Sequence, residues 1–309
     1  MDLRIFTEPQ QGATYDQLLA VARLAEDCGF NAFFRSDHYL KMGDATGLPA
    51  YTDAWTTLAG LARDTRTIRL GTLVTPVTFR PVGSFPVVVS QVDHMSGGRV
   101  EVGLGAGWYE PEHHDYGLPF PSSKARYDLL EDQLRILHGA WSAPAGQLFE
   151  LSGHTCSVSL DPAPLRPAQR PHPPLIMGGS GGPRNAALAA AYADEFNAPF
   201  VAPDQVSKAF ESVRAACEKR DRDPATLVWS TANVVCCGRS EAELTRRAQA
   251  IGRELPELRE NGFAGSPAEV LDKMGAYASR GAQRIYLQVL DLSDSDHLRL
   301  IAEEVMPNV

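Results

Sequence analysis

The chain has 309 residues, of which 44% are hydrophobic and 22% charged, a composition that supports a large buried core. Its 38 acidic and 29 basic residues give a formal net charge of −9, which disfavours nucleic acid and anionic membranes as partners. No apolar run is long enough to span a bilayer, and the first residues enter a strand pattern without a leader, so we expect a cytoplasmic protein. The five cysteines include no C-x-x-C pair and predict neither a disulfide framework nor a zinc site.

The first half of the chain alternates between strand and helix patterns. Apolar runs that end in polar or small residues predict strands over 3–8, 31–36, 68–76 and 100–105. Helical spacing predicts helices over 15–28, 53–64, 82–95 and 124–141. Gly97 stands where a helix typically ends, directly after the third of these helices.

The alternation is interrupted between about residues 142 and 174. Six prolines lie between Asp161 and Pro174, a density that excludes a helix. Residues 149–160 have the pattern of a short antiparallel excursion. We therefore predict an insertion of functional or docking character between the fourth and fifth strands.

The alternation of strand and helix patterns resumes after the predicted insertion. Strands are predicted over 175–177, 195–198, 227–237 and 284–290, and helices over 184–193, 205–220, 241–253, 267–280 and 294–305. Eight strands, each followed by a helix, predict a single TIM (β/α)8 barrel domain over residues 1–309. An open doubly wound sheet is the alternative, but it favours a glycine-rich turn after the first strand, where Glu8-Pro9-Gln10 stands.

The carboxyl ends of barrel strands form the active site, so the residues there are functional candidates. Asp37 and His38 follow the second predicted strand. Histidine titrates near neutrality and can both donate and accept a proton, which makes this pair a candidate acid/base set. His113 and His114 lie in a polar segment that we interpret as a solvated lid rather than a metal site, and no H-x-H motif occurs on the first strand.

Two glycine-rich segments follow strands four and five. Gly103-Leu104-Gly105-Ala106-Gly107 is not a dinucleotide fingerprint, because Trp108 takes the place of the third glycine and no helix follows directly. We expect these glycines to let the backbone approach a flat ligand. The run Gly178–Gly182 leads through Pro183 into a helix that starts near Arg184, which predicts a phosphate site; a mobile turn is the alternative.

Together these motifs resemble the bacterial luciferase-like oxidoreductases, and more closely the branch that uses the deazaflavin coenzyme F420. The resemblance covers nearly the whole chain. It is carried by Ser36-Asp37-His38, Leu70–Pro76, Ser96-Gly97-Gly98-Arg99, Gly103–Trp108, Gly178–Gly182 and Tyr192-Ala193-Asp194 before Asn197.

The resemblance implies a role for each of these segments. The ring of F420, or of flavin mononucleotide (FMN), should lie against the ends of strands three and four, with Asp37 near the ring or ribityl chain and His38 as the acid/base residue. A non-proline cis peptide at Thr72–Leu73 should stand behind the ring. The predicted cofactor contacts are Asp37, Thr72, Leu73, Gly105, Ala106, Gly107, Trp108, Gly178, Gly179, Ser180, Gly181, Gly182 and Arg184.

The chain departs from the sugar-phosphate dehydrogenases of that branch. Where they have a tryptophan after the histidine and a glutamate in the strand-four loop, the corresponding positions are Met42 and Trp108. No Lys/Arg cluster suits a sugar phosphate, so we expect Trp108 and Tyr109 to line an apolar pocket under a lid over 108–121.

These observations predict an enzyme that transfers a hydride between F420 and a small organic substrate. The first alternative is an FMN-dependent monooxygenase that uses O2 and reduced flavin from a separate reductase. The second is a non-catalytic flavin-binding protein. The resemblance also implies a homodimer.

Overall fold

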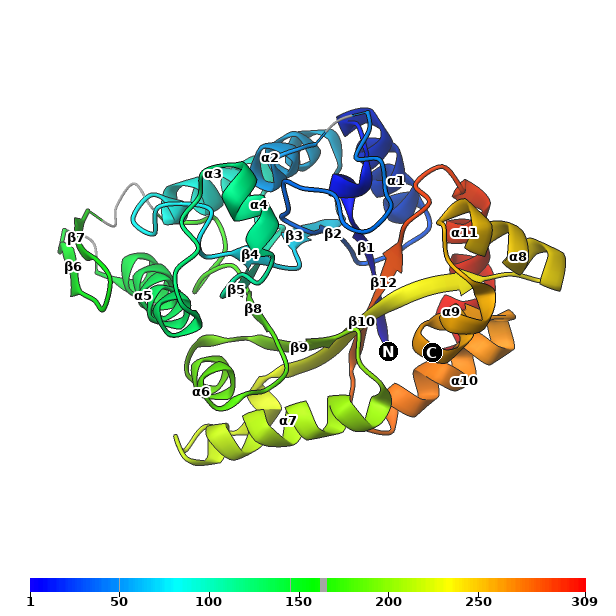
Figure 1. Ribbon diagram of the computed structural model, residues 1–309. Helices are drawn as coiled ribbons and strands as arrows, with labels where there is room; N and C mark the ends of the chain where they lie inside the picture. Colours follow the sequence, from blue (N-terminus) through cyan, green and yellow to red (C-terminus); the bar gives the residue numbers. More distant parts are fainter. Residues whose placement is uncertain (50, 145, 162–165) are drawn as a thin grey trace.

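The computed structural model describes residues 1–49, 51–144, 146–161 and 166–309. Within them, eight parallel strand positions close into a barrel surrounded by helices (Figure 1). The barrel strands, in chain order, are β1 (Asp2–Thr7), β2 (Ala32–Arg35), β3 (Arg69–Thr72) continued by β4 (Thr75–Pro76), β5 (Val100–Gly105), β8 (Leu175–Gly178), β9 (Glu195–Pro199), β10 (Val228–Cys237) and β12 (Arg284–Val289). β12 pairs with both β1 and β10, and β10 with β9, which closes the barrel and confirms the predicted TIM fold.

The outer helices lie within a few residues of their predicted positions. They are α1 (Tyr15–Asp27), α2 (Ala54–Asp64), α3 (Phe85–Ser96), α5 (Ser123–Ser142), α6 (Pro183–Tyr192), α7 (Pro203–Glu218), α10 (Pro267–Ala278) and α11 (Ser295–Leu300), which continues as a π-helical turn over Ile301–Val305. Local sequence signals explain where two of these helices begin. Thr14 forms a capping box with Gln17 at the start of α1, and Ser266 forms one with Glu269 at the start of α10.

The region after β10 differs from the prediction of one helix over 241–253. Helix α8 (Glu241–Ala250) ends before Gly252, which has a φ of 65°. A further helix, α9 (Leu255–Asn261), begins with a proline in its first turn and leads into β11 (Phe263–Gly265). β11 pairs with the far end of β10, so the sheet extends beyond the barrel here and carries α9 to the rim of the mouth.

The predicted insertion contains the expected antiparallel hairpin, formed by β6 (Phe149–Ser152) and β7 (Ser157–Leu160). The buried Asp132 carboxylate of α5 anchors its turn, because it accepts hydrogen bonds from the backbone N–H groups of His154 (2.9 Å) and Thr155 (2.7 Å). In Figure 1 the hairpin lies outside the helical ring, next to α5. Residues 145 and 162–165 of the predicted insertion lie outside the described residues.

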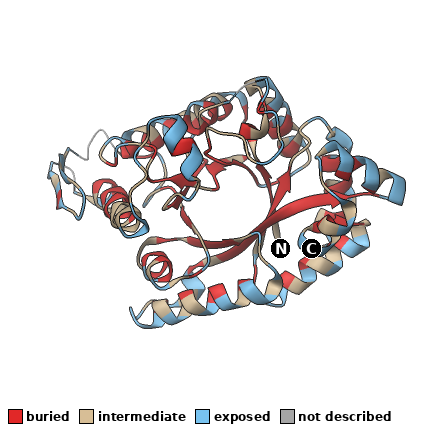
Figure 2. Ribbon diagram, in the orientation of Figure 1, coloured by how far each residue is buried: buried red, intermediate tan, exposed pale blue. Residues whose placement is uncertain are grey.

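The barrel interior has two layers, and its strands are buried along most of their length (Figure 2). At the amino-terminal end, buried charges are paired: Arg4 binds Glu101 at 2.6 Å, and Arg284 binds Glu195. Above them lies an apolar cluster of Phe6, Ala32, Phe34, Leu73, Ile176, Ala232 and Tyr286, with Val74 packed against it. This cluster is the floor of the barrel mouth.

The break between β3 and β4 corrects one prediction. The non-proline cis peptide joins Leu73 and Val74, one bond later than the predicted Thr72–Leu73. A Cβ at Gly103 would lie 2.0 Å from the Thr72 carbonyl oxygen, and one at Gly105 would lie 2.9 Å from Val74 Cγ2. These two glycines therefore make room for the neighbouring strand of this chain, a requirement that the sequence pattern did not distinguish from a ligand contact.

We predict that Gly103→Ala lowers the free energy of unfolding by about 3 kcal/mol, because the added methyl group overlaps a backbone oxygen that cannot move away. Gly275→Ala is the matched control. Gly275 lies inside α10, and a Cβ there would meet no atom within 4 Å beyond the backbone of its own helix, so alanine should stabilise the protein by about 1 kcal/mol. Urea unfolding measures both. Equal stability of the two variants would contradict the packing argument.

We also predict an acid-sensitive contribution from His297. Burial, reinforced by Arg247, lowers the pKa of His297 from 6.5 to about 4, and its Nε2 accepts the Cys237 N–H at 2.9 Å. The unfolded chain therefore binds a proton that the folded chain excludes, so this contribution is complete above pH 6.5 and is lost as the pH falls to 4, by about 3 kcal/mol. His297→Gln should remove this slope from urea-unfolding curves; a parallel slope in the variant would exclude His297 as its source.

Candidate active site

His38 follows β2 at the barrel mouth, and a buried carboxylate holds its ring. Nδ1 lies 2.8 Å from Glu112 Oε1 and 3.1 Å from Oε2, and the Tyr39 N–H donates to Oε2 at 3.1 Å. Glu112 is fully buried, while His38 keeps 9% exposure. Since the carboxylate accepts the Nδ1 proton, the opposite nitrogen, Nε2, is left without a partner among the described residues and can exchange a proton with a ligand.

Glu112 was not among the predicted site residues. It lies in helix α4 (Glu110–Asp115), inside the segment predicted as a solvated lid. His113 beside it is also fully buried and bonded through both nitrogens, to Thr78 Oγ1 at 2.6 Å and to the Tyr109 carbonyl at 2.8 Å. The solvated interpretation is therefore wrong for these two residues. Pro111, followed by an acidic residue, is a helix-start signal that could have predicted α4.

Asp37 lies behind this pair rather than in the open mouth. It is fully buried, and it binds Arg80 Nη1 at 2.5 Å and accepts the Thr75 hydroxyl at 2.8 Å. Arg80 also pairs with Asp53, the N-cap of α2. Burial opposes ionisation of Asp53, but Arg80 and the Thr56 N–H outweigh it and lower its pKa. This network holds the chain that carries His38; a direct contact of Asp37 with cofactor stays a prediction.

The Gly178–Gly182 turn leads into α6, as the sequence predicts. Its Gly181 N–H donates to Asn185 Oδ1 at 3.2 Å, whereas the amides of Ser180 and Gly182 have no partner among the described residues. Arg184 differs from its predicted place beside these amides. Its guanidinium turns to α5, where it binds Asp128 at 2.6 Å and Glu131 at 3.3 Å. An anion at this turn would therefore meet backbone amides and the helix dipole.

A cavity of about 480 Å³ opens at the mouth, between the ends of β1, β10 and β12 and helix α9. Its lining includes Glu8, Trp108, Phe200, Asn233, Arg253 and Gln288. Glu8 was not predicted as a site residue. Its carboxylate accepts a hydrogen bond from Gln11 at 3.3 Å, and burial raises its pKa. Trp108 therefore borders both this cavity and the predicted ring site.

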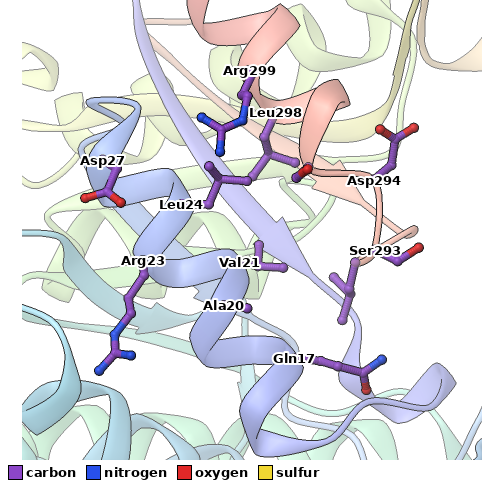
Figure 3. Close-up of a pocket in the computed structure, with 12 residues that line it drawn as sticks. Gln17, Ala20, Val21, Arg23, Leu24, Asp27, Ser293, Asp294, Leu298 and Arg299 are labelled. Atoms are coloured by element: carbon purple, nitrogen blue, oxygen red, sulfur yellow. The ribbon is translucent and has the colours of Figure 1, made fainter.

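A second hollow of about 470 Å³ lies outside the barrel. Figure 3 shows it between α1 and α11, with Val21 and Leu24 on one side and Leu298 and Arg299 on the other. None of the predicted site residues lines it. The mouth cavity, which lies at the strand ends, is the better candidate for a reaction site.

The fold and this geometry define a TIM-barrel protein with a candidate ligand site at the carboxyl ends of its strands. Residues 1–284 match the luciferase-like monooxygenase family, and the chain belongs to that family. None of the helices in the described ranges combines the length and apolar character needed to cross a membrane.

Curated relatives include an F420-dependent dehydrogenase and a monooxygenase. The F420-dependent hydroxymycolic acid dehydrogenase of Mycobacterium tuberculosis is 31% identical over 220 residues, which cover 69% of this chain and 56% of that protein. The pyrimidine monooxygenase RutA of Stutzerimonas stutzeri is 29% identical over 237 residues, or 71% of this chain and 61% of that protein. The matches thus span about three fifths of these relatives' lengths.

Solved structures show the same fold. The coenzyme F420-dependent tetrahydromethanopterin reductase of Methanopyrus kandleri has a TM-score of 0.81 at 17% identity, covering 99% of this chain and 98% of that one. The FMN-bound oxygenating constituent of 3,6-diketocamphane monooxygenase from Pseudomonas putida has a TM-score of 0.77 at 18% identity, covering 100% and 99%. The chain therefore has the F420-dependent dehydrogenase and the monooxygenase as sequence relatives, and it shares its fold with the F420-dependent reductase and the FMN-bound oxygenase.

We predict that Arg80→Met destabilises the protein by about 3–5 kcal/mol, because it removes the guanidinium that is directly ion-paired with the buried Asp37 carboxylate. The double variant Arg80→Met/Asp37→Asn should recover most of that loss, since the remaining group is neutral. Urea unfolding of the two variants and the wild type measures the difference. A double variant less stable than Arg80→Met would show that Asp37 is held by other contacts.

Proposed function

We propose that this protein is an oxidoreductase that transfers a hydride between coenzyme F420 and a small organic substrate. The observation that carries the proposal is the buried His38–Glu112 pair, which leaves Nε2 without a protein partner among the described residues at the mouth. Hydride transfer to or from a carbonyl, alcohol, imine or amine changes the proton affinity of the substrate. A histidine oriented by a carboxylate can give or take that proton.

The surrounding residues suit such a cofactor. We place the ring against Leu73–Val74 and Gly105–Trp108, with Thr72 behind it, and the phosphate at Gly178–Gly182. The amides of Ser180 and Gly182, which have no partner in the described ranges, fit an anion, and a Cβ at Gly181 would lie 2.8 Å from the Ala209 backbone, so the turn depends on glycine there. Bound F420 would supply the carbon that accepts or gives the hydride.

The protein's own residues would control the proton and exclude water. Glu112 fixes the orientation of the His38 ring and stabilises its protonated form during the reaction. The rings of Trp108 and Tyr109 meet the His38 ring edge-on, with centroids at 5.8 and 6.2 Å, and shield it on one side. We propose that the segment 108–121, which the contact between Glu112 and His38 holds in place, acts as a lid that covers the bound substrate.

The cofactor assignment is tested by titrating the purified protein with F420 and, separately, with oxidised FMN, while cofactor fluorescence is recorded. We expect F420 to bind more tightly than FMN by at least about tenfold, a difference of about 1.4 kcal/mol. Tight binding of FMN alone would overturn the proposal. Oxygen consumption with reduced FMN would then favour the monooxygenase, which needs a reductase as partner, whereas binding without turnover would favour a flavin-binding protein.

We predict that Glu112→Gln slows hydride transfer about 10- to 100-fold while F420 affinity stays unchanged, because the histidine loses the charge that stabilises its protonated form. The rate is followed through the cofactor's visible absorbance with a panel of alcohols, ketones, amines and imines. Glu110→Gln is the matched control, since Glu110 is an exposed acid of the same helix. Equal rates for both variants would remove Glu112 from the mechanism.

A further inference from the structure

The mouth cavity has an aromatic wall that is open to solvent. Trp108 is 65% exposed and Phe200 is 49% exposed, although both are large apolar side chains. Phe200 also has a φ of 55°, a region that bulky residues rarely adopt, and its N–H donates to the Ala232 carbonyl at 2.8 Å. Aromatic rings held open at a cavity are typical of a surface on which a ligand stacks.

Glu8 gives the same cavity a carboxylate that forms no ion pair with the described residues. In the described part of the chain, no Lys, Arg or His nitrogen lies within 4.0 Å of its oxygens. Its polar neighbours are the neutral amides of Gln11 and Gln288. The nearby Arg253 is already bound by Glu257, with contacts of 2.6, 2.7 and 3.0 Å. The cavity therefore holds a carboxylate for which the described residues provide no ion-pair partner, beside aromatic faces, and two further acids, Glu257 and Glu260, also line it.

Aromatic faces next to a carboxylate form a cation site, since both attract a positive charge when water is displaced. We propose that this cavity binds a cationic organic substrate, an amine or its iminium form, with the nitrogen at Glu8 and the apolar body between Trp108 and Phe200. That the bound amine is a substrate rests on the proposed function, whereas the preference of the cavity for a cation does not.

The negative charge of Glu8 suits hydride transfer at a carbon atom that is bonded to nitrogen. A substrate bound as an ammonium ion would first give one N–H proton to His38 Nε2, the proton-exchanging atom of the proposed function. Its C–H bond would then break as the hydride leaves for oxidised F420, and the freed nitrogen lone pair would form the C=N bond. The product is an iminium ion, so one positive charge appears at the nitrogen. In the reverse direction the iminium accepts a hydride from reduced F420. Glu8 would stabilise the cation in either direction.

The test is calorimetric binding to the purified protein without cofactor, using three probes of similar size: benzylamine, benzyl alcohol and benzoate. We expect benzylamine to bind at least tenfold more tightly than benzyl alcohol, and benzoate to bind least. Equal binding of the amine and the alcohol would overturn the proposal in favour of a neutral ligand. Tightest binding of benzoate would overturn it in favour of an anion.

Two substitutions test which side chains bind the amine. Glu8→Gln should abolish the preference for benzylamine and leave benzyl alcohol binding unchanged, whereas Phe200→Ala should weaken both. Glu218→Gln is the control, because Glu218 is an exposed acid at the end of α7. An undiminished amine preference in Glu8→Gln would refute the assignment.

A pH titration of the wild type tests the same point without a substitution. Burial raises the pKa of Glu8 despite the opposing charges of His38 and Arg253, so benzylamine affinity should fall as acid neutralises this carboxylate. Benzyl alcohol affinity should not change, and a parallel fall for both probes would count against Glu8. Loss of F420 binding in the separate titration would overturn the proposed function but leave the amine preference standing, so the two failures are distinguishable.

Discussion

The contact between the Glu112 carboxylate and His38 Nδ1 is the constraint on which the site depends. It joins the end of β2 to a short helix after β5, and both groups are buried. An unpaired carboxylate at that depth would be costly, so the contact fixes the loop as well as the imidazole. It therefore links the position of Trp108 and Tyr109 to the proton-transfer geometry of the mouth.

The barrel supports this contact through packing that glycine alone allows. Gly103 and Gly105 let β5 approach the break between β3 and β4, which places Val74 against the apolar floor. Below the floor, paired charges fill the amino-terminal half of the barrel. The mouth is thus a shallow site over a solid core, with the Arg80 network holding the β2 side in place.

Periodicity predicted the barrel because its eight strands are buried on both faces and read as continuous apolar runs. The position of His38 at a strand end followed from the same pattern. The features that the sequence did not predict depend on tertiary contacts. Arg184 turns to the acids of α5, which lie far from it in the sequence, and the cis bond falls at Leu73–Val74, where no local residue type signals it.

Glu8 shows a different kind of omission. In the sequence, Glu8-Pro9-Gln10 served only as evidence against a glycine-rich turn after the first strand. A role for Glu8 in a site becomes visible once α9 and the loop after β9 enclose a cavity around it. A crystal structure of the protein with F420 would test whether hydride transfer takes place beside His38. We predict the ring against Leu73–Val74, with His38 Nε2 within about 3 Å of a cofactor or substrate atom. A ring bound elsewhere, with His38 out of reach, would contradict it.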